Sequence, residues 1–74
     1  MENQYRQIKD YRELTQVDID IMNEIKTKGA ELGELVNKLR NTEGLDQRWV
    51  SIGATDFQTG LMALTRSVAQ PTFF

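Results

Sequence analysis

The chain has 74 residues, room for a single domain (residues 1–74) whose core is too small to be stable without further support. It lacks cysteine and histidine, which excludes disulfides, thiolate chemistry and the usual zinc ligand and proton shuttle. Nine Lys and Arg against 11 Asp and Glu give a net charge of −2, which argues against binding long DNA or RNA but not a small anion.

The N-terminal residues are polar and charged, without the apolar stretch typical of a signal peptide or of a membrane span. We therefore expect a protein that stays in the compartment where it is made and does not enter a membrane. Between residues 2 and 13, Tyr5, Ile8 and Tyr11 recur every three residues among many charges. This spacing predicts a short, weak helical segment whose order depends on its neighbours.

A long helix is predicted from Gln16 to about Asn41. Thr15 is its N-cap, and Asp18 three residues later favours the positive end of the helix dipole. Apolar and small residues alternate at spacings of three and four along one side of this helix: Met22, Ile25, Gly29, Leu32, Val36 and Leu39, with Ile21 and Leu35 beside them. This is the pattern of a helix that packs along a partner helix.

Gly44 is suited to a left-handed stop after the first helix, and Asp46 can cap a second helix from Gln47 to about Gln70, before Pro71. Its main apolar stripe has the same spacing as the first: Val50, Ala54, Phe57, Leu61, Leu64 and Val68. A second stripe, formed by Trp49, Ile52 and Ala63, lies on a different face. One antiparallel partner covers only one of these stripes.

We therefore predict an all-α fold, in which the N-terminal segment precedes an antiparallel two-helix hairpin. The main stripes form the core within the hairpin. The second apolar stripe cannot be buried within the hairpin, so we expect it to be buried by contact between subunits of a homo-oligomer. Two glycine pairs, Gly29 with Gly33 and Gly53 with Gly60, indicate either close backbone approach or plain tolerance of glycine in a helix.

Catalysis is not indicated. Ser51 and Ser67 lie within a predicted helix without a basic partner, and the acidic residues Asp20 and Glu24 are explained by a solvated first helical turn. Neither a phosphate-binding loop nor a metal-ligand spacing occurs, so we expect a non-enzyme with no metal and no cofactor. What remains is a set of cations and aromatics near apolar positions. A small cyclic nucleotide needs such a set, with one cation for each phosphate and flat surfaces for its bases.

Two motifs in the chain resemble a known family. The first half carries Tyr11-Arg12-x-Leu14-Thr15 and Asn23-x-Ile25-Lys26-x-x-Gly29, and the second carries Asp46-x-Arg48-Trp49-x-x-Ile52-x-x-Thr55-x-x-Gln58-x-Gly60-x-Met62-Ala63-Leu64-x-Arg66. Together they resemble the phage anti-CBASS cyclic-nucleotide sponges, whose hairpin domain is shared with sponges that inhibit Thoeris immunity. The resemblance covers about residues 11–74, and the second motif is the more specific half.

The resemblance implies a homo-oligomer, a hexamer in the family, in the cytoplasm of an infected bacterial host. It implies binding of cyclic dinucleotides between protomers, and of cyclic trinucleotides at a separate site, without cleavage. Tyr11 resembles the base-stacking tyrosine of the family, Lys26 its phosphate-binding lysine, and Arg66 lies in its C-terminal motif. The other candidates are Lys28 and Phe74, proposed from chemistry and proximity, and Arg48 and Thr55 for the trinucleotide.

The sequence leaves two alternatives to the sponge open. One is a small helical adaptor that binds a protein partner through the same apolar stripes and has no nucleotide ligand. The other is an enzyme that degrades the messenger.

Overall fold

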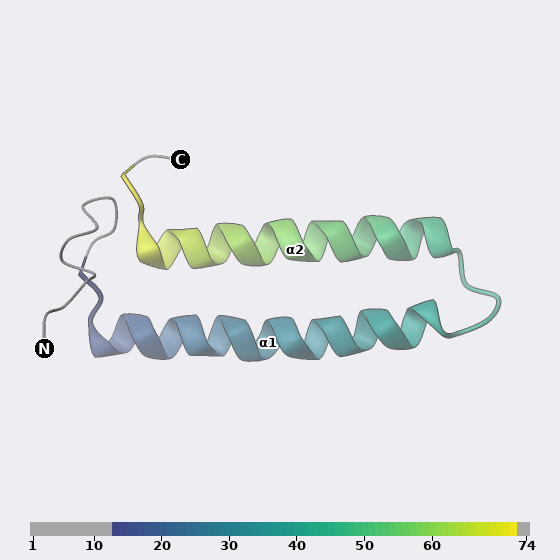
Figure 1. The fold of residues 1–74 in the computed structure, drawn as a ribbon, viewed down its shortest axis with the longest axis horizontal. Coiled ribbons are helices and arrows are strands. Elements are labelled where there is room, and N and C mark those ends of the chain that lie inside the picture. The colour runs from purple at the N-terminus through teal and green to yellow at the C-terminus, as the bar shows by residue number, and fades with distance from the viewer. Residues whose placement is uncertain (1–12, 73–74) are drawn as a thin grey trace, which may run out of the picture.

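The computed structural model describes residues 13–72, which form two long antiparallel helices joined by a short loop (Figure 1). Helix α1 spans Gln16–Arg40 and helix α2 spans Gln47–Ala69. The predicted all-helical hairpin is confirmed, with helix ends within one residue of those expected. The short helix predicted between residues 2 and 13 lies outside the described residues, apart from Glu13.

Thr15 caps α1 through two reciprocal hydrogen bonds with Asp18. The backbone N–H of Asp18 donates to Thr15 Oγ1 at 3.2 Å, and the backbone N–H of Thr15 donates to Asp18 Oδ2 at 2.9 Å. Two backbone N–H groups that would have no partner within the helix are thereby satisfied. Asp46 does the same for α2, where its carboxylate accepts from the backbone N–H groups of Arg48 and Trp49 at 3.0 and 3.3 Å.

The loop between the helices closes in a way that the sequence only partly predicts. α1 ends at Arg40 with Asn41 as a C-cap of φ −96°, so the left-handed glycine is not the helix cap. Gly44 has φ +87° and turns the chain within the loop instead, a conformation that glycine adopts without steric penalty. The side-chain amide of Gln47 then donates to the carbonyl of Leu39 at 3.2 Å, which ties the start of α2 to the last turn of α1.

α2 ends in a left-handed residue. Gln70 has φ 48°, and its backbone N–H donates to the carbonyl of Arg66 at 2.8 Å. Pro71 cannot continue the helix and follows directly, as the sequence predicts.

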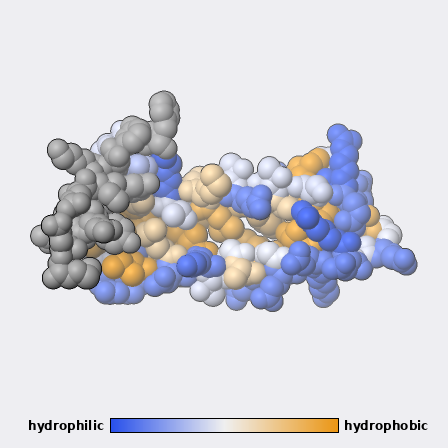
Figure 2. Space-filling view, in the orientation of Figure 1, coloured by the Kyte–Doolittle hydropathy of each residue, from blue (hydrophilic) through white to orange (hydrophobic). Residues whose placement is uncertain are grey.

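The contact between the helices is narrow. Every member of the predicted α1 seam is half-buried, but among residues 13–72 only Val68 is fully buried, at 8% exposure. The prediction that Phe57 and Leu64 belong to the core is wrong, because they are 42% and 55% exposed. Both lie at the edge of the α2 stripe, and a single partner helix is too narrow to cover that edge. Figure 2 shows the result as apolar surface left open to solvent between hydrophilic borders.

Gly29 is the one predicted glycine at which the helices approach closely. A Cβ built there would lie 3.3 Å from Leu61 Cδ1, whereas Gly33, Gly53 and Gly60 have open space around them. Close approach therefore explains Gly29 alone. Within residues 13–72, neither helix is apolar enough over a sufficient length to cross a bilayer.

Candidate functional site

A groove of about 880 Å³ runs between the two helices near their open end, where α1 begins and α2 ends (Figure 1). We call it the Lys26–Arg66 groove, after the two cationic residues among those that line it. Its lining residues come from both helices and from the segment after α2: Met22, Asn23, Ile25, Lys26, Gly29, Thr59, Leu61, Met62, Ala63, Thr65, Arg66 and Pro71. A volume of this size is typical of small-molecule sites, which span about 300–1,000 Å³.

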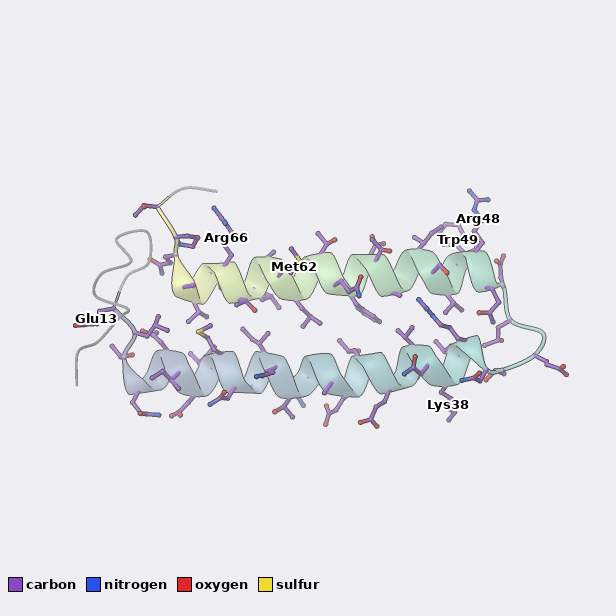
Figure 3. The ribbon with its side chains drawn as sticks, viewed as in Figure 1. Glu13, Lys38, Arg48, Trp49, Met62 and Arg66 are labelled. Carbon is purple, nitrogen blue, oxygen red and sulfur yellow. The ribbon has the colours of Figure 1, made fainter. Side chains whose placement is uncertain are left out.

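The groove combines an apolar floor with polar and cationic groups at its sides. Ile25 and Leu61 are half-buried where the helices meet, and Leu61 packs directly against Gly29. Lys26 and Arg66 are both exposed and come from opposite helices. Figure 3 shows Arg66 projecting from α2 on the side away from α1, so its guanidinium lies at the outer rim. Such a surface can hold planar bases against its floor and phosphates at its rims.

The structure separates Lys28 from Lys26. Residues two apart in an α-helix point about 200° away from each other, because each residue turns the helix by about 100°. Lys28 accordingly lines a different hollow with Ile21 and Leu64, and its Nζ lies 3.8 Å from Glu31 Oε1. The two candidate lysines therefore do not belong to one pocket within a single chain.

Arg48 and Thr55 lie far along α2 from the groove. Arg48 is in the first turn of α2, next to the hairpin loop, and Arg66 is in the last (Figure 3). Eighteen residues separate them, which corresponds to about 27 Å along a helix. Spacings of seven and eleven residues place Arg48, Thr55 and Arg66 on one face of α2. Within one chain they therefore form an extended stripe rather than a compact trinucleotide pocket.

The other two candidates, Tyr11 and Phe74, lie outside residues 13–72, and their assignments stay predictions. The groove also contains polar residues that the sequence analysis did not select as ligand-binding candidates. Asn23 lies one turn before Lys26, and Thr59 and Thr65 contribute from α2. The Thr65 hydroxyl donates to the carbonyl of Leu61 at 2.9 Å and keeps its lone pairs as acceptors. Asn23 lies three residues before Lys26 and Thr59 seven before Arg66, and this helical spacing is the signal that finds these two.

No group of three acidic side chains within residues 13–72 is close enough together to hold a metal ion. What the groove supplies is therefore cations, amide and hydroxyl groups, and an apolar floor. This chemistry suits the binding of an anionic ligand with planar parts.

Comparison with known proteins agrees with the two sequence motifs. Residues 5–69 match the model of the Acb2/Tad1 hairpin domain family. The chain belongs to this family. It is also 37% identical to anti-CBASS protein 2 of Pseudomonas phage JBD67, in an alignment covering 96% of this chain and 97% of that relative. The resemblance to the anti-CBASS sponge family is thus confirmed. The matched range contains the whole α1–α2 pair and every residue that lines the Lys26–Arg66 groove except Pro71.

Proposed function

We propose that this protein counters CBASS immunity by binding cyclic oligonucleotide messengers and withholding them from the bacterial effector, without cleaving them. Cyclic dinucleotides are the primary ligands, and cyclic trinucleotides bind at a second site on the outer face of α2. The protein acts as a homo-oligomer, a hexamer as the family resemblance implies. It works in the cytoplasm of the infected bacterium.

The observation that carries this proposal is that Lys26 and Arg66 both line one groove with an apolar floor. The two residues are forty apart in sequence, and the antiparallel hairpin brings them to the same end. A cyclic dinucleotide has two phosphates and two bases, which match two cations and a floor that can accept planar rings. The name of the phage relative, anti-CBASS protein 2, supports the same biological role.

Sequestration is a matter of affinity rather than of turnover. A sponge lowers the free messenger only if its dissociation constant lies well below the messenger concentration. A nanomolar constant corresponds to about −12 kcal/mol. A groove open on one side of a single hairpin buries only part of a ligand, so a second protomer or the Tyr11 segment is needed to enclose the rest.

The test is to incubate the purified protein with a cyclic dinucleotide, remove unbound ligand, denature the protein and identify what is released. We expect intact cyclic ligand in stoichiometric amounts. A linear product would show that the protein is instead an enzyme that degrades the messenger. Absence of any retained nucleotide would favour the adaptor, in which the exposed apolar residues bind a protein partner.

A further inference from the structure

A second groove, of about 580 Å³, lies between the helices on the hairpin-loop side of the first. We call it the Arg40–Phe57 groove, after its cation and its aromatic ring. Gly29 and Leu61 line both grooves. Spacings of seven and fourteen residues place Gly33 and Arg40 on the side of α1 that carries Lys26. The two grooves therefore follow one another along the same side of the hairpin.

Packing within the hairpin does not explain the glycine at position 33. Glycine inside a helix is destabilising relative to alanine. At Gly29 the close approach of Leu61 accounts for the missing side chain, but a Cβ built at Gly33 would have no neighbour within 4 Å among the described residues. Gly33 lines the Arg40–Phe57 groove. The missing side chain therefore leaves room for a ligand to approach the backbone of α1.

Polar side chains from both helices surround this space. Those that line the groove are Glu34, Asn37 and Arg40 of α1 and Gln58 of α2, and all four are exposed. Within residues 13–72, Arg40 and Glu34 form no ion pair, and the side-chain amides of Asn37 and Gln58 have no hydrogen-bond partner. The ring of Phe57 lines the same groove and is 42% exposed. A concave surface with an uncovered ring and a few convergent polar groups is typical of a small-molecule site.

We propose that the Arg40–Phe57 groove binds a purine nucleoside monophosphate, at a site separate from that of the cyclic oligonucleotide. The Arg40 guanidinium pairs with the phosphate oxygens, and the ring of Phe57 stacks on the base. The amides of Asn37 and Gln58 each offer a donor and an acceptor, which match the neighbouring N6 amino group and N7 of adenine. The Glu34 carboxylate accepts from the ribose hydroxyls.

The charges of the groove favour one phosphate over several. Among its lining residues, Arg40 is the only cation and Glu34 the only anion. A ligand with a second phosphate would bring negative charge towards Glu34 without a second cation to balance it. The groove is also smaller than the Lys26–Arg66 groove, at about 580 against 880 Å³. A mononucleotide therefore fits better here than a cyclic dinucleotide does.

The test is a calorimetric titration of the full chain with adenosine monophosphate, for which we expect saturable binding at one site per chain. Arg40→Ala is expected to raise the dissociation constant at least tenfold. The matched control is Lys38→Ala, which removes the same charge two residues away from a side chain that points away from α2 (Figure 3), and it should bind like the wild type. Cytidine monophosphate should bind severalfold more weakly, because its smaller ring stacks less and lacks the N6/N7 edge.

Gly33→Leu tests the groove without removing a charge. Its side chain fills the space above the α1 backbone and should abolish binding of adenosine monophosphate. Since a Cβ at this position meets no neighbour, the variant is expected to fold, with unchanged helix content by circular dichroism. Lys26→Ala, in the first groove, should leave this binding intact.

Three results would overturn the proposal. The first is a wild type that does not saturate at millimolar adenosine monophosphate. The second is equal loss of affinity in Arg40→Ala and Lys38→Ala, which would indicate attraction by net charge alone. The third is loss of binding in Lys26→Ala but not in Arg40→Ala, which would place the nucleotide in the first groove. If the wild type fails to bind and Gly33→Leu sediments differently from it, a second chain and not a nucleotide occupies the groove.

The inference does not depend on what the Lys26–Arg66 groove binds, and the two proposals can fail separately. A protein that binds adenosine monophosphate but retains no cyclic dinucleotide would refute the proposed function alone. A protein that retains the cyclic dinucleotide but does not bind adenosine monophosphate would refute the Arg40–Phe57 site alone.

Discussion

Lys26 places a positive charge on the α1 side of the groove, one turn after Met22 and Asn23. Its long aliphatic stem can lie along the apolar floor while its ammonium group reaches a phosphate at the rim. Arg66 offers a flat guanidinium with several donors from the opposite helix, a geometry that suits a second phosphate or the edge of a base. The two residues therefore have different roles, although both carry the same charge.

We predict that Lys26→Ala weakens binding of a cyclic dinucleotide about tenfold to a hundredfold. The reason is the loss of a charge-assisted hydrogen bond, which contributes about 1.5–3 kcal/mol. Isothermal titration calorimetry measures the change. Lys38→Ala is the matched control, because Lys38 is an exposed lysine of α1 that points away from α2 (Figure 3).

Equal loss of affinity in Lys26→Ala and Lys38→Ala would mean that net charge, and not the groove, determines binding.

Tyr11→Ala is expected to weaken binding as Lys26→Ala does, through loss of base stacking, and to leave the oligomer intact. Titrations of Tyr11→Ala and Lys26→Ala that match the wild type would refute both assignments.

The distance between helices α1 and α2 depends on the contact between Gly29 and Leu61. We predict that Gly29→Val lowers the free energy of unfolding by about 1 kcal/mol or more relative to Gly33→Val. The two variants carry the same change in helix propensity. Only the first pushes a side chain into Leu61, since Gly33 has open space around it. Urea denaturation at one protein concentration gives the difference, and equal stabilities would show that the helices separate freely at Gly29.

The ends of both helices were predictable because the chemistry that fixes them is local. Thr15 and Asp46 satisfy N–H groups within three residues of themselves, and Pro71 acts on its direct neighbours. The position of Gly44 relative to the end of α1 was less predictable. Its left-handed conformation followed from its type, but hydrogen bonds from the Asn41 and Thr42 side chains to α1 carbonyls close the helix earlier.

The burial of the α2 stripe could not be predicted to the residue. Periodicity gives the angle of a residue around its helix, but not how wide a strip the partner covers. Val68 at the centre of the strip is buried, whereas Leu64 at its edge is exposed. For the same reason the pattern identified Lys26 and Lys28 as neighbours of the seam without separating their sides. Only the packed hairpin assigns Lys26 to the groove and Lys28 to the opposite face.

For the whole molecule, the hairpin has two unlike sides. One is a groove with polar and cationic groups above an apolar floor, and the other carries exposed apolar residues such as Ile21 and Leu64 among charged ones such as Lys28. The first suits a small anionic ligand, and the second suits a flat protein surface. A chain with so small a core gains stability by covering the second side, and in doing so it holds the first side in a fixed position.

Because the hairpin buries so little by itself, folding and association should be coupled, and the midpoint of thermal unfolding should rise with protein concentration. For a dimer, a tenfold increase in concentration contributes about 1.4 kcal/mol, or about 0.7 kcal/mol per chain. In a chain of this size that raises the midpoint by about 3 °C or more, and a larger oligomer raises it further.

Circular dichroism at 222 nm, followed from micromolar to hundred-micromolar protein, measures this dependence. The Leu64→Lys variant is the informative comparison, since Leu64 is 55% exposed and a charge there should weaken contact between chains and lower the midpoint. It should also leave a smaller rise with concentration over the same range. A wild-type midpoint that does not change with concentration would mean that the isolated hairpin is stable with its apolar face exposed to water.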